Sequence, residues 1–166
     1  MPPLKLVALD PEDLKIVSAH LQDAVMRVAD LAYLPKEQRF AAIVNRFDWT
    51  VPNADIRDRR TVNQRLRTAL RFEHVTAVKR QSIVQSAPGA VLSLLAIRFE
   101  ETAAPSGVVT LVFAGGGALR LDVECVEAEM RDLGPIWTTP NRPDHDQDDD
   151  TKGSAKMFGW PPQGQR

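Results

Sequence analysis

The stretch from Val108 to Leu133, VVTLVFAGGGALRLDVECVEAEMRDL, constrains the fold more than any other part of the chain. It begins with a β-branched and aromatic run that ends at Phe113, and a group of three glycines comes soon after. Leu119, Leu121 and Val123 then alternate with polar residues, which is the period-two pattern of a half-buried strand. We therefore predict a β-hairpin whose two strands are joined by the glycines.

The period changes directly after this second strand. Val126, Met130 and Leu133 are spaced as i, i+4 and i+7, which is the spacing of one face of a helix. Gly134 and Pro135 are residue types that end helices. The sequence thus predicts a C-terminal helix that continues from the hairpin.

The earlier part of the chain predicts one more helix and several strands. Asp10 followed by Pro11 is typical of a helix N-cap, and the spacing of Leu14, Val17 and Leu21 predicts a helix that reaches about Ala24. A loop is predicted from Pro52 to Arg65. The predicted strands are Leu4–Leu9, the region from Met26 to Leu34, Phe40–Val51, Leu66–Phe72, a segment from Val75 through Val78 towards Ile83, and Val91–Phe99.

Alternate residues of the long strand from Phe40 to Val51 share a face. We predict that the face with the aromatic residues is buried and that the face with Arg46, Asp48 and Thr50 is exposed. On this interpretation Trp49 is buried beside Phe47. The residues assigned to the buried face are Ala41, Ile43, Asn45, Phe47, Trp49 and Val51.

Together these elements predict an α+β domain over residues 1–137, with a curved, mainly antiparallel β-sheet or partial barrel and an N-terminal and a C-terminal helix. About seven strands followed by a helix also resemble the pleckstrin-homology-like topology, an analogy of order that does not fix function. Residues 138–166 contain several prolines and the acidic run from Asp144 to Asp150. We predict that they form a disordered tail.

Three segments carry a closer resemblance: LKLVALDPEDLKIVSAHLQDAV, AYLPKEQRFAAIVNRFDW, and LSLLAIRFE with VTLVFAGGGALRLDVECVEA. They resemble an uncharacterised family of bacterial proteins known as a domain of unknown function. The resemblance covers about residues 4–137. It implies no activity, cofactor or catalytic residue.

Composition restricts the function classes. The apolar share is 43%, and no run approaches the roughly 18 apolar residues that a membrane span needs. The formal net charge is −1, so we do not expect the chain as a whole to bind nucleic acid by charge. The first residues lack the pattern of a signal peptide, and Cys125 is the chain's single cysteine, so we expect a cytoplasmic protein.

The residue types that carry chemistry are few and scattered. Gly115, Gly116 and Gly117 would suit a phosphate cradle only if a helix followed them, and because a strand follows we interpret them as a hairpin turn. Cys125 is interpreted as a small buried side chain, since neighbouring glutamates oppose a thiolate. His20 is interpreted as a boundary residue and His145 as part of a solvated charge run. We predict no catalytic residue, cofactor or metal site.

An arginine cluster between Pro52 and Arg71 is the strongest polar feature. Guanidinium groups suit phosphate and carboxylate partners, although a solvated loop with local Arg–Asp pairing is the more ordinary interpretation. The candidate residues for binding an anion or a partner are Arg57, Arg59, Arg60, Arg65 and Arg67.

The sequence therefore favours a non-enzymatic, cytoplasmic binding module for a protein or peptide partner, with the arginine cluster and an exposed sheet edge as candidate surfaces. The alternative is an enzyme that acts on a small anionic substrate held by the arginines at positions 57–71. We expect no membrane partner, and a nucleic-acid partner would require a continuous basic face.

Overall fold

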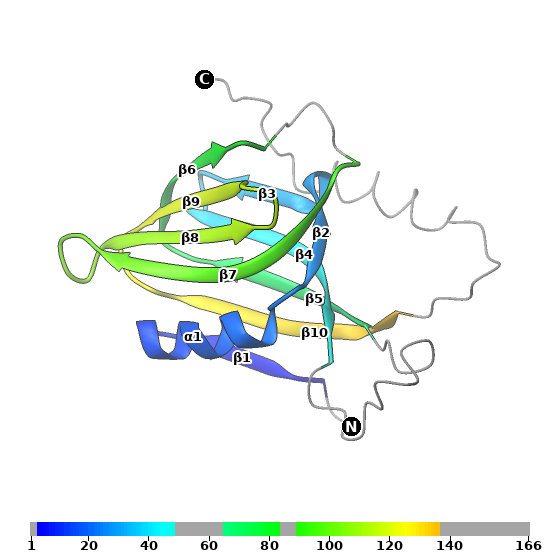
Figure 1. Ribbon diagram of the computed structural model, residues 1–166. Coiled ribbons are helices and arrows are strands. Elements are labelled where there is room, and N and C mark those ends of the chain that lie inside the picture. The colour runs from blue at the N-terminus through cyan, green and yellow to red at the C-terminus, as the bar shows by residue number, and fades with distance from the viewer. Residues whose placement is uncertain (1–2, 49–64, 84–88, 137–166) are drawn as a thin grey trace.

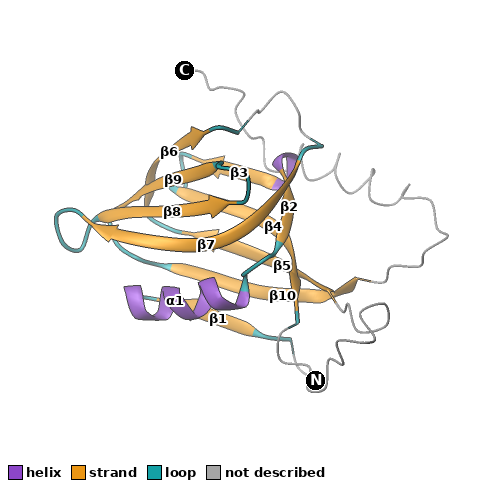
Figure 2. Cartoon of the chain, viewed as in Figure 1, coloured by secondary structure: helices purple, strands orange, loops and turns teal. Residues whose placement is uncertain are grey.

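Ten strands form one curved antiparallel sheet, and a single α-helix accompanies it in the described part of the chain (Figures 1 and 2). The computed structural model describes residues 3–48, 65–83 and 89–136. The elements are β1 (Lys5–Ala8), α1 (Pro11–His20), β2 (Val25–Arg27), β3 (Leu31–Leu34), β4 (Arg39–Phe47), β5 (Arg65–Phe72), β6 (Val75–Gln81), β7 (Val91–Glu101), β8 (Gly107–Phe113), β9 (Ala118–Val123) and β10 (Ala128–Ile136). A short 3-10 turn, Val28–Asp30, joins β2 to β3.

The sheet runs in the order β1-β10-β5-β4-β2-β7-β8-β9-β6, and β3 pairs with β4 beside this path. Strand β2 links two halves, because Val25 pairs with Asn45 of β4 and with Ser93 of β7. The chain passes between the halves at a tight turn, where His74 has a positive φ of 60°. Two backbone hydrogen bonds, of 2.9 and 3.0 Å, join Glu73 and His74 to the segment between β9 and β10. The sheet thus folds back on itself around one core.

Helix α1 lies along β1 and β7 (Figure 1) and contributes buried Leu14 and Val17 to the core. It begins as predicted: the Asp10 carboxylate accepts a 2.7 Å hydrogen bond from the N–H of Asp13, which caps the first turn. The Ser18 hydroxyl then accepts a 2.9 Å hydrogen bond from the N–H of Ile97 in β7. No helix in the described residues is long and apolar enough to cross a membrane.

The glycine hairpin is confirmed. Strands β8 and β9 pair in register from Gly107 to Val112, and the N–H of Phe113 donates a 2.9 Å hydrogen bond to the carbonyl of Gly117. Gly115 and Gly116 have φ values of 87° and 95°, which side chains other than glycine rarely adopt. A strand follows the turn, so the phosphate-cradle interpretation is excluded on geometry.

The predicted C-terminal helix is wrong, because residues 128–136 form strand β10. It lies between β1 and β5 and pairs with both. Ala128, Met130 and Asp132 point inward, while Leu133 is 53% exposed, so the true period is two. The acidic, helix-favouring composition of this segment is a weak preference that two ladders of backbone hydrogen bonds override. The analogy to the pleckstrin-homology-like order placed a helix after the last strand, and the described residues do not show that topology.

The predicted faces of β4 are also wrong. Phe40, Ala42, Val44 and Arg46 are buried, whereas Ala41, Ile43, Asn45 and Phe47 lie on the outer face. The prediction failed because it treated Arg46 as a solvent-facing charge, although its side chain is buried against a carboxylate. On β5, Thr68, Leu70 and Phe72 are buried and Leu66, which lies on the same side of the strand, is half-buried. Trp49, most of the predicted loop from 52 to 65, and the tail 138–166 lie outside the described residues.

Candidate functional site

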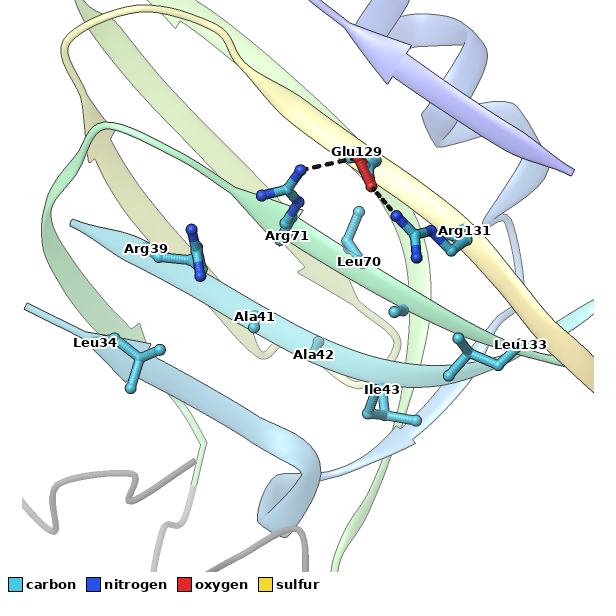
Figure 3. A pocket seen from close by; sticks show the side chains of 11 residues that line it. Leu34, Arg39, Ala41, Ala42, Ile43, Leu70, Arg71, Glu129, Arg131 and Leu133 are labelled. Carbon is cyan, nitrogen blue, oxygen red and sulfur yellow. Dashed lines mark hydrogen bonds and ion pairs between the residues drawn. The ribbon is translucent and has the colours of Figure 1, made fainter. Parts of the chain in front are cut away.

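The outer face of β3, β4, β5 and β10 carries a trough of about 450 Å³ that is open to solvent on one side (Figure 3). Small and aliphatic side chains line its middle, with Leu34 at one end and Leu133 at the other. Its full lining is Leu34, Arg39, Ala41, Ala42, Ile43, Ala69, Leu70, Arg71, Glu129, Arg131 and Leu133. An apolar floor on the outer face of a sheet is informative, because that face normally meets water with polar side chains.

The register explains why the floor is hollow. Ala41 is paired with Arg71 and Ile43 with Ala69, so the two small residues Ala41 and Ala69 are diagonal neighbours on two central strands. On the next strand, Glu129 stands beside Arg71 and Arg131 beside Ala69. The long charged side chains therefore rise around a patch of short ones, and this difference in length forms the trough.

A continuous chain of ion pairs borders the trough. The Glu73 carboxylate accepts hydrogen bonds of 2.9 Å from Nε of Arg39 and from Nη1 of Arg71. The Glu129 carboxylate accepts bonds from Nη2 of Arg71, at 2.9 Å, and from Nη2 of Arg131, at 3.4 Å. Nζ of Lys5 lies 3.9 Å from the same carboxylate. Four cations thus share two carboxylates, and the border carries an excess of positive charge.

The carboxylates of this border are more deeply buried than the cations. The side chains of Glu73 and Glu129 are 14% and 12% exposed, whereas the side chain of Arg71 is 42% exposed. The hydrogen bond from Arg71 lowers the pKa of Glu129, although partial burial opposes this effect. The reciprocal bond raises the pKa of Arg71. Glu129 is therefore held as an anion beneath a layer of guanidinium groups, and the outermost charges of the border are positive.

Two of the five predicted site arginines extend this face. Arg65 and Arg67 lie on β5 at the outward positions before Ala69, and Arg65 stacks over the Phe47 ring at 4.9 Å from its centroid. Neither of them lines the trough itself. The other three, Arg57, Arg59 and Arg60, lie outside the described residues.

Sequence reasoning missed the residues that come from other strands: Lys5, Arg39, Ala41, Ile43, Glu129, Arg131 and Leu133. Two wrong predictions hid four of these residues. The prediction exchanged the inner and outer faces of β4, so it placed Ala41 and Ile43 in the core. It also assigned a helix to the residues of β10, and on a helix Glu129 and Arg131 would not share one face. The period-two alternation of Glu129, Arg131 and Leu133 with Ala128, Met130 and Asp132 was the signal that could have found the site.

The other residues considered from sequence do not join the trough. Cys125 is half-buried, and burial together with the charges of Glu127 and Glu124 raises the pKa of its thiol, which disfavours the thiolate form. His20 is half-buried, and burial followed by the charge of Arg46 lowers its pKa. The described residues contain no group of three or more His, Cys, Asp or Glu side chains arranged to hold a metal ion. His145 lies outside the described residues.

Comparison with known proteins places the chain without assigning an activity. Neither the curated proteins nor the solved structures contain a match. A family model described as a protein of unknown function (DUF2948) matches residues 4–145, which include every strand described above. The chain therefore belongs to the DUF2948 family.

Proposed function

We propose that the protein is a binding module that holds a protein or peptide partner in the outer trough of β3, β4, β5 and β10. The observation that carries this proposal is the apolar floor of the trough next to a border with four cations and two carboxylates. A partner that combines small apolar side chains with carboxylates would match both features.

The chemistry of the border favours binding over catalysis. Both carboxylates accept hydrogen bonds from arginine, and the pKa of Glu129 is lowered, which makes it a weak base. The arginines are held in fixed positions by these pairs, so they are preorganised to accept a carboxylate without further ordering. An enzyme acting on a small anion is the competing function, and the arginines would then hold the substrate.

The first experiment is a capture from native lysate with three forms of the full chain. Ile43→Glu places a carboxylate on the apolar floor, and Leu95→Glu makes the same kind of change at an exposed leucine on β7, in the other half of the sheet. The proposal expects proteins that are retained by the wild type and by Leu95→Glu but lost by Ile43→Glu. Urea unfolding of all three forms shows whether the Ile43 variant is folded.

The arginine cluster is tested separately, after a partner has been identified by the capture experiment. Replacing Arg57, Arg59 and Arg60 by Ala is expected to weaken the binding of a partner that also contacts the arginine cluster, and urea unfolding of this variant measures any change in stability that accompanies the substitutions. If every captured protein binds the Ile43→Glu variant as well as the wild type, the trough is not the binding surface. Turnover of small anions by the purified chain would favour the enzyme instead.

A further inference from the structure

The outer face of β6, β9, β8 and β7 carries a row of cations that lies in the other half of the sheet from the trough. Lys79 stands opposite Arg120, Arg120 opposite Thr110, and Thr110 opposite Arg98. The neighbours of Arg120 along β9, Leu119 and Leu121, are buried, so the row points outward. The three cations are exposed and Thr110 is half-buried.

Two β-bulges bring the outer cations into this row. The register of β6 against β9 shifts between Val75 and Ala77, and the register of β7 against β8 shifts between Leu94 and Ala96. Without the first shift, Lys79 would stand opposite Leu119 and not Arg120. Without the second, Arg98 would stand opposite Val109 and not Thr110. Bulges re-aim side chains in this way and are frequent beside functional sites.

The row is not neutralised within the described residues. Lys79 has one weak contact, with its Nζ 4.0 Å from the carboxylate of Asp122. The side chains of Arg98 and Arg120 make no hydrogen bond or ion pair with another described residue. The nearest acidic residues on these strands are Glu100 and Asp122, which stand on either side of Val108. Each is two residues further along its strand than the cation of the row. Like charges directly opposite one another destabilise a sheet, so folding alone does not account for the Lys79–Arg120 pair.

We propose that Arg98, Thr110, Arg120 and Lys79 form a binding site for the phosphate group of a small soluble molecule. Neighbouring strands are about 4.8 Å apart, so the backbones of the two arginines are separated by roughly 10 Å across Thr110. Side chains of this length can converge above the threonine, whose hydroxyl donates to the same anion. Guanidinium forks match the oxygens of phosphate, and the Lys79 ammonium adds a third positive charge.

The test is an NMR titration of the full chain, with inorganic phosphate and with glycerol 3-phosphate at constant ionic strength. Saturable shifts are expected first at the amides of Thr110, Arg120 and their cross-strand neighbours. The double variant Arg98→Gln with Arg120→Gln is expected to weaken binding by at least about ten-fold. A matched control, Lys15→Gln with Lys36→Gln, removes two exposed positive charges elsewhere and should leave the affinity within about two-fold.

A second measurement separates binding from misfolding of the variant. Phosphate should raise the melting temperature of the wild type and of the control variant, because a ligand of the folded state stabilises it. It should not raise that of the double variant, whose own melting temperature should equal or exceed the wild-type value. Tighter binding of the ester than of free phosphate would identify an organic phosphate as the ligand. Equal weakening in both double variants, or shifts that do not saturate, would overturn the proposal.

Discussion

The guanidinium of Arg46 and the carboxylate of Asp132 form a two-pronged ion pair inside the sheet, with bonds of 2.9 and 2.7 Å. Their side chains are 2% and 5% exposed. The Thr68 hydroxyl donates a third bond, of 2.8 Å, to the same carboxylate. The pair joins β4 to β10 across β5, and the two residues are 86 positions apart in sequence.

Removing one member of this pair should destabilise the fold strongly. Asp132→Ala leaves a buried guanidinium without its counter-ion, and we expect a loss of about 3–5 kcal/mol in the free energy of unfolding. Urea denaturation measures this. The control is the double replacement Arg46→Met with Asp132→Leu, which removes both charges and should recover most of the loss. A single-variant loss below about 1 kcal/mol would mean that water reaches the pair.

Acid should weaken the fold through the same carboxylate. Burial by itself raises the pKa of Asp132, but the hydrogen bonds from Arg46 and Thr68 and the charge of Arg46 outweigh it, so the pKa lies below its usual value of 3.8. A lowered folded-state pKa contributes stability above the unfolded value, and this stability is lost as the pH falls through the folded value.

We therefore expect the wild-type free energy of unfolding to fall steeply below about pH 4, in unfolding curves recorded at successive pH values. The Asp132→Asn variant should show a shallower fall in that range, from a lower starting stability. Glu129→Gln is a useful second variant, because the pKa of Glu129 is lowered in the same direction by its bond from Arg71. Parallel pH profiles for the wild type and Asp132→Asn would contradict this assignment.

The glycine turn allows backbone strain to be tested separately from steric clashes of an added side chain. A side-chain carbon added at Gly116 meets no atom within 4 Å, but its φ of 95° disfavours a β-branched residue. Gly116→Val should therefore cost more than about 1 kcal/mol in the free energy of unfolding. Gly89 also has open space around it and lacks a positive φ, so Gly89→Val is the control and should be nearly neutral. Equal losses at both glycines would count against the strained turn.

We predict that the acidic run from Asp144 to Asp150 competes with external anions for the basic surface, because a segment of the same chain acts at a high effective concentration. Deleting residues 138–166 should strengthen the binding of an external acidic peptide to the trough, and rising salt should reduce the difference between the two forms. Affinities of the full and the shortened chain, measured at low and at high salt, check this. Equal affinities at low salt would rule the competitor out.

Local patterns were sufficient for several elements. The glycines between two apolar runs predicted the β8–β9 hairpin, because glycine readily adopts the positive φ that a tight turn between two strands requires. Asp10 and Pro11 predicted the start of α1, since capping depends on residues that are adjacent in sequence. Alternation predicted a strand from Leu66 to Phe72, which agrees with β5 to within one residue. The resemblance of three segments predicted membership of a family of unknown function.

Contacts between strands that are distant in sequence decided the conformation of β10, the faces of β4 and the position of the trough. Residues 126–133 fit both a helical and an alternating pattern, and the neighbouring strands β1 and β5 select the strand by completing its hydrogen bonds on both sides. Arg46 can be buried only because Asp132 faces it, a fact absent from the local sequence of β4. The trough depends on the same two outcomes, since it exists only when Ala41 and Ile43 face outward beside a strand that carries Glu129 and Arg131. A charge is placed inside or outside by its partner, and the partner here is fixed by the folded sheet.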